Sequence, residues 1–112
     1  MPSFLQQVSY SREGLQALIK NPQNRIDHVR SVIEKLGGKI QTAWFAFGEY
    51  DVVVIAELPD NVSAAALSMA FSAGGSCNKV LTTPLLSPAE AMEAMKKAGT
   101  TGYRPASASA SA

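Results

Sequence analysis

The sequence predicts an α+β domain in which four strands form one antiparallel sheet and helices cover one of its faces. Two strand-like runs flank Gly48, apolar residues recur at helical spacing from Ile26 to Leu36, and a further strand-like run contains Pro84. The resulting order is β-α-β-β-α-β with an added helix. Short connections and right-handed crossovers turn this order into a four-stranded antiparallel sheet with both main helices on the same face.

The first part of the chain predicts a strand followed by a long helical region. In the run SFLQQVSY, residues 3–10, apolar and polar residues alternate in part, which is typical of a strand. The helical region that follows contains Asn21 and Pro22, which favour a break, with Asn21 as the N-cap of the second helical piece. The pair Gly37 and Gly38 ends the helix, because glycine is favoured just past a helix C-terminus.

The middle of the chain predicts a β-hairpin. The runs KIQTAWFAF and YDVVVIAEL are separated only by Gly48 and Glu49. A two-residue loop that begins with glycine is typical of a type II′ turn, which requires a positive φ at its first central residue. We therefore expect Gly48 and Glu49 to form the turn and Phe47 to face Tyr50 as the closing pair.

The last part predicts a helix, an edge strand and a second helix. After Pro59, Asp60 or Asn61 caps an alanine-rich helix, and Pro84 confines the strand that follows to a sheet edge or to the end of pairing. The run SPAE, beginning at Ser87, predicts a capping box. Residues 1–99 form the domain on this reading, and the Ala- and Ser-rich residues 100–112 form a disordered tail. The whole arrangement is ferredoxin-like.

One face of the predicted sheet has no helix to cover it. The two-residue period places an almost wholly apolar set of hairpin residues under the helices. The opposite face is too apolar to leave in water, so a second subunit is expected to cover it. This predicts a homodimer or a larger assembly of dimers, with these interface residues: Ile40, Thr42, Trp44, Val53 and Ile55.

Composition excludes several classes of function. The 112-residue chain has a formal net charge of +1, so no strong positive field favours nucleic acid or an anionic membrane as partner. Cys77 is the only cysteine and His28 the only histidine, which argues against a metal site and predicts no cofactor. We find no signal-like N-terminus and no long apolar run, so the expected location is cytoplasmic.

Three residues near the hairpin are the candidates for a ligand site. Asp51 is the foremost, because a carboxylate on the sheet is costly unless it is paired. Its two interpretations are a hydrogen bond that holds the hairpin or interface, and a polar anchor or general base in a pocket. Tyr50 is interpreted as a packing residue with its hydroxyl at the rim, and Trp44 as interface core in preference to a ligand platform.

The stretch FGEYDVVVIAELPDN resembles the signature of the GYD-domain family, which is named for a Gly-x-Tyr-Asp element. In this chain the element is formed by Gly48, Tyr50 and Asp51. The resemblance extends from QQVSYSREGLQAL through EKLGGKI to VLTTPLLSPAEAMEAM. It implies a ferredoxin-like fold of the dimeric α/β-barrel type. It implies little about chemistry, because the family as a whole is largely uncharacterised.

Two functions of different classes remain open on the sequence. The favoured hypothesis is a non-catalytic homo-oligomer that binds a small molecule or assists another system. The alternative is a cofactor-poor enzyme, similar to monooxygenases or isomerases, that acts on a small aromatic or quinone-like substrate. Such an enzyme needs an acid–base pair, and the sequence offers only Asp51 with Tyr50 or Tyr10. Cys77 follows a helix end and His28 lies off the apolar stripe, so neither is expected to react.

Overall fold

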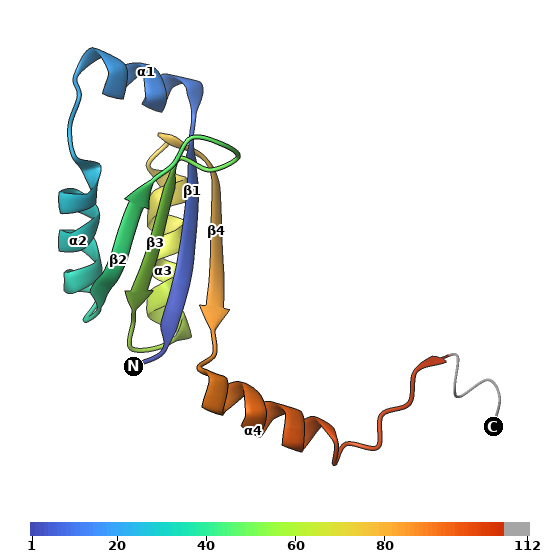
Figure 1. The fold of residues 1–112 in the computed structure, drawn as a ribbon. Helices are drawn as coiled ribbons and strands as arrows, with labels where there is room; N and C mark the ends of the chain where they lie inside the picture. Colours follow the sequence, from blue (N-terminus) through green and yellow to red (C-terminus); the bar gives the residue numbers. More distant parts are fainter. Residues whose placement is uncertain (107–112) are drawn as a thin grey trace.

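The computed structural model describes residues 1–106, and these residues form one four-stranded antiparallel sheet with helices around it (Figure 1). The strand order is β2-β3-β1-β4, which is the ferredoxin-like arrangement and confirms the predicted fold class. The elements, in chain order, are β1 (Ser3–Tyr10), α1 (Arg12–Lys20), α2 (Arg25–Lys35), β2 (Lys39–Phe45), β3 (Val52–Glu57), α3 (Asn61–Ala73), β4 (Cys77–Leu85) and α4 (Pro88–Ala98).

The first helical region is divided in two, as the Asn-Pro pair predicts. The residue that caps the second piece differs from the prediction, however. Asn21 ends α1, its N–H bonding to the carbonyl of Ala17, and Asn24 caps α2 by accepting the N–H of Ile26 at 3.0 Å. Pro22 therefore lies in the connection. As Figure 1 shows, this break lets α1 cross the end of the sheet while α2 runs alongside β2.

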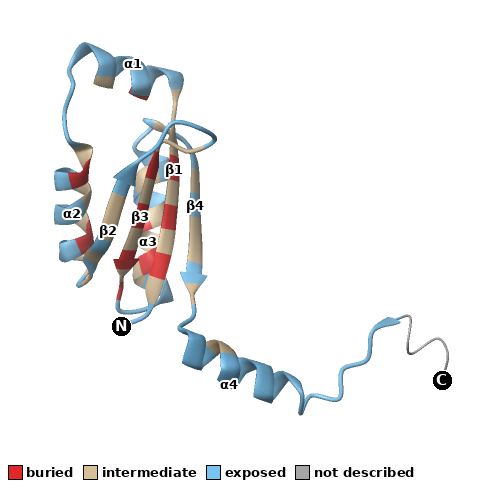
Figure 2. Ribbon diagram, in the orientation of Figure 1, coloured by how far each residue is buried: buried red, intermediate tan, exposed pale blue. Residues whose placement is uncertain are grey.

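The core lies between the helices and the inner face of the sheet. Alternate residues of β1 and β3 point inward and meet Ile26 and Ile33 of α2 and Ala64 and Leu67 of α3. Figure 2 shows these buried positions gathered on the two central strands and on the helices beside them. The buried strand residues are Phe4, Gln6, Val8, Val52, Val54 and Ala56.

The hairpin differs from the prediction in two ways. The strands pair only as far as Phe45 and Val52, and the phi angle of Gly48 is not positive, so the predicted two-residue type II′ turn of Gly48 and Glu49 is wrong. A six-residue loop, residues 46–51, replaces it and is closed by the Ala46 N–H donating to the carbonyl of Asp51 at 2.8 Å. The loop is wider because Asp51 bonds to β1, as described below.

The second difference is a register shift in β2. Pairing shifts by one residue between Ile40 and Thr42, so Ile40 faces Ala56 and packs against the core. The prediction that Ile40 lies on the outer face is therefore wrong, because a bulge reverses the alternation of side chains along a strand. The register beyond the bulge is the predicted one, and it places Thr42, Trp44, Val53 and Ile55 on the outer face.

Helix α4 extends away from the sheet and has no buried residue (Figure 2). It begins with the predicted capping box, in which Ser87 Oγ accepts the Glu90 N–H at 3.1 Å and Glu90 Oε1 accepts the Ser87 N–H at 3.0 Å. Its start is thus determined by local hydrogen bonds. Of the predicted tail, residues 107–112 lie outside the described residues.

Candidate functional site

A cavity of about 470 Å³ lies between the inner face of the sheet and the helices. Its floor is made by alternate residues of β1, namely Gln6, Val8 and Tyr10, and by Val52 and Val54 of β3. This size is in the range of pockets that hold small organic ligands. The remaining walls come from α1, α2, the end of α3 and the start of β4, including Val29, Val32, Phe71, Ser76 and Cys77.

Close contact between two backbones forms the end of the cavity where α1 crosses the sheet. The N–H of Ser11, the N-cap of α1, donates to the carbonyl of Ser76 at 2.8 Å. Gly14 is buried against the same carbonyl, and a Cβ built on it would lie only 2.5 Å from the Ser76 oxygen. A side chain at position 14 would therefore force α1 away from the start of β4.

Gln6 is the unusual residue of the cavity floor. It is 1% exposed and lies between Phe4 and Val8 on the inward face of a central strand. Its Oε1 accepts a hydrogen bond from Thr82 Oγ1 at 2.8 Å, while its Nε2 has no partner among the described residues. A buried donor without an acceptor costs about 1–3 kcal/mol, so this amide is retained at the expense of stability.

Tyr10 and Cys77 approach each other at the other end of the floor, since they are paired between β1 and β4. Burial raises the pKa of the Tyr10 hydroxyl, and the neighbouring Cys77 and Asp51 raise it further, whereas Arg25 opposes them. Burial also raises the pKa of the Cys77 thiol against the effect of Arg25. Both groups are consequently protonated at neutral pH, and Tyr10 can donate a hydrogen bond.

Arg25 and His28 bring α2 to the same cavity. The Arg25 side chain is partly buried, and its hydrogen bond within residues 1–106 is a long one of 3.4 Å to Gln23 Oε1. No carboxylate forms an ion pair with Arg25 in the described part of the chain. The guanidinium therefore gives this end of the cavity a positive charge that is free to meet an anion.

Asp51 lies outside the cavity and has a structural partner. Its Oδ2 accepts the N–H of Tyr10 at 2.8 Å, and its own N–H donates to the carbonyl of Val8 at 2.8 Å. The backbone pairing of β1 with β3 stops at Val8 and Val52, so the Asp51 carboxylate satisfies the next strand N–H in place of a carbonyl. This favours the structural interpretation of Asp51.

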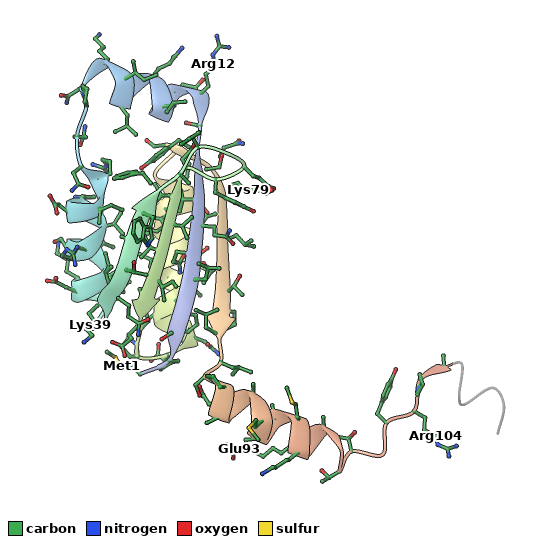
Figure 3. All side chains as sticks on the ribbon, in the orientation of Figure 1. Met1, Arg12, Lys39, Lys79, Glu93 and Arg104 are labelled. Carbon is green, nitrogen blue, oxygen red and sulfur yellow. The ribbon has the colours of Figure 1, made fainter. Side chains whose placement is uncertain are left out.

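The other two predicted site residues also lie apart from the cavity. Trp44 is 67% exposed on the outer face of the sheet. Tyr50 lies in the loop, where Lys79 Nζ is 5.5 Å from the centre of its ring and 3.3 Å from Glu49 Oε1. Figure 3 shows Lys79 on β4 beside this loop. These contacts hold the loop against the edge strand, and Tyr50 does not line the cavity.

Sequence reasoning missed Gln6, Arg25 and the grouping of Tyr10 with Cys77 and His28. A signal for Gln6 was present, because a polar residue between Phe4 and Val8 interrupts the apolar inward face of β1. Nothing in the local sequence places Cys77 or His28 in the same cavity as Tyr10, because this depends on how α2 and β4 dock. No group of three or more His, Cys, Asp or Glu residues within residues 1–106 could hold a metal ion.

The fold defines a small ferredoxin-like protein with a cavity between sheet and helices. The GYD domain family matches residues 4–95, and the chain therefore belongs to the GYD family. No curated protein matches the chain. No helix of the described residues is long and apolar enough to cross a membrane.

Proposed function

We propose that this GYD-family protein is a non-catalytic homo-oligomer that binds a small molecule in the cavity between sheet and helices. The observation that carries the proposal is the buried, half-satisfied amide of Gln6 on the cavity floor. A ligand oxygen would complete its hydrogen bonding and offset its cost. The cytoplasmic location remains a prediction from the sequence.

The outer face of the sheet supports the oligomeric part of the proposal. On this face Trp44 of β2 is 67% exposed and Leu81 of β4 is 43% exposed. Val53 and Ile55 belong to β3, which lies between these two strands in the sheet. An exposed apolar patch of this kind usually marks a contact surface. A second copy packing its own sheet on this face would bury both patches at once.

The enzymatic alternative draws on the same cavity but has weaker support. Tyr10, Cys77 and His28 all line it, and a protonated tyrosine can serve as a general acid. The raised pKa of Cys77, however, disfavours the thiolate that a nucleophile requires. Recognition by hydrogen bonding therefore fits these side chains better than covalent chemistry does.

Native mass spectrometry of the untreated protein tests both parts of the proposal. We expect an even number of subunits and an added mass that is lost on denaturation. Val29→Trp should fill the cavity and abolish the added mass, whereas Val62→Trp, at a position that is 78% exposed on α3, should retain it. Equal retention of the added mass by both variants would contradict binding in this cavity.

The sheet contact has its own test. Trp44→Glu should dissociate the oligomer, because it places a charge in a desolvated interface. Phe47→Glu is the control, since Phe47 is fully exposed in the loop. Light scattering at micromolar concentration measures the outcome, and a wild-type mass equal to one subunit would refute the oligomer.

A further inference from the structure

The chemistry of the cavity is asymmetric along strand β1. Gln6 and Tyr10 are four residues apart on the same face, which places their Cα atoms roughly 13 Å apart. Gln6 lies at the fully buried end, whereas Tyr10 lies at the end bordered by Arg25. The apolar side chains between these ends are those of Val8, Val29, Val52 and Phe71.

The buried end selects a neutral acceptor. Thr82 Oγ1 donates a hydrogen bond to Gln6 Oε1, so the hydrogen-bonding group of Gln6 that has no partner is the Nε2 donor. One amide donor in apolar surroundings does not compensate the desolvation of a carboxylate, but it does satisfy a carbonyl oxygen. Because neighbouring protein atoms cover Nε2, a ligand reaches it through a rotation of the terminal Gln6 torsion, which is a soft one.

The opposite end selects an anion. Arg25 is partly exposed and has no carboxylate partner within residues 1–106, and the Tyr10 hydroxyl beside it is a donor. A guanidinium with a neighbouring hydroxyl suits a carboxylate, which keeps part of its hydration at a partly open site.

We infer, on the basis of the proposed function, that the ligand is an elongated apolar carboxylic acid that carries a ketone or similar carbonyl at its far end. Arg25 and Tyr10 hold the carboxylate, and Gln6 Nε2 donates to the carbonyl. Val8, Val29 and Phe71 enclose the apolar body between these two contacts.

Three probes of matched shape test this assignment by isothermal titration calorimetry. They are 4-(4-acetylphenyl)butanoate, which has both groups, 4-(4-isopropylphenyl)butanoate, which lacks the carbonyl, and 4′-butylacetophenone, which lacks the carboxylate. We expect the wild type to bind the keto acid about tenfold more tightly than either analogue, since one well-made hydrogen bond contributes about that factor.

The variants assign each contact to its residue. Gln6→Leu should bind the keto acid and the isopropyl acid equally, and Arg25→Gln should bind the keto acid and the neutral ketone equally. Gln6→Met gives the same comparison if Gln6→Leu does not fold. Unchanged selectivity in folded Gln6 and Arg25 variants would overturn the inference.

The two levels of the proposal fail in different ways. A retained ligand in native mass spectrometry, with no preference among the three probes, would refute the ligand class and leave the proposed function standing. The absence of both a retained ligand and any probe binding would refute binding in this cavity altogether.

Discussion

Replacement of Asp51 tests whether its carboxylate is a structural extension of the sheet. In Asp51→Ala the Tyr10 N–H loses the acceptor that lies 2.8 Å away in a partly buried position. An unsatisfied donor of this kind costs about 1–3 kcal/mol. At roughly 4 °C per kcal/mol for a domain of this size, a loss of about 2 kcal/mol lowers Tm by roughly 8 °C.

Asp51→Asn separates the contribution of the acceptor oxygen from that of the negative charge. The amide keeps one acceptor oxygen and loses only the charge assistance, so we expect a smaller loss of about 1 kcal/mol. Glu93→Gln is the control, because Glu93 is exposed, lies beyond the first turn of α4 and makes no hydrogen bond or ion pair within residues 1–106. Its Tm should equal that of the wild type.

The assay pairs thermal unfolding by circular dichroism with native mass spectrometry of the same samples. The structural role predicts that Tm falls in the order wild type, Asp51→Asn, Asp51→Ala, while a retained ligand persists in every folded variant. An unchanged Tm together with loss of the ligand would refute this reasoning and make Asp51 part of the site.

Two further predictions concern the cavity wall. Gly14→Ala should lower the free energy of unfolding by about 1–3 kcal/mol, because its Cβ would press on the carbonyl of Ser76. Gly48→Ala is the control and should unfold like the wild type, because a Cβ at position 48 meets nothing within 4 Å. Equal Tm values for both variants would contradict the contact. Burial raises the pKa of Tyr10 and of Cys77 above their ordinary values of 10.0 and 9.0, so both groups stabilise the folded state fully below those values and lose this contribution as pH rises through the folded pKa. Tm measured from pH 7 to pH 11 should therefore fall more steeply for the wild type than for Tyr10→Phe, and parallel curves would count against a buried hydroxyl.

Local signals in the sequence were sufficient for the bounds of β1 and for the starts of α3 and α4. β1 was predicted at residues 3–10 and observed there, and the capping box at Ser87 was also correct. Of the two residues predicted as the cap of α3, Asp60 and Asn61, the cap is Asp60. For the two caps the deciding hydrogen bonds are made between residues three positions apart. Such contacts can be predicted from a sequence because they do not depend on the tertiary structure.

The hairpin loop and the site depend on contacts between distant residues, and there the sequence was insufficient. Gly48 and Glu49 have the composition of a tight turn, but Asp51 is drawn to β1 and opens the loop. The bulge between Ile40 and Thr42 has no local signature. One end of the cavity is formed where α1 docks on Ser76, and this explains why the sequence pointed to Asp51 and missed Gln6 as a site residue.

Helix α4 has a consequence for how unfolding is observed. Its 11 residues bury nothing within the described chain, and isolated helices of this length are marginal in water even when they are well capped. In a lone subunit its helical signal would therefore fade gradually on heating, before the sheet and its core unfold cooperatively. In an assembly whose subunits enclose it, far-ultraviolet and near-ultraviolet circular dichroism would report one shared transition. The coincidence of these two melting curves thus becomes an optical measure of whether the C-terminal helix has a neighbour.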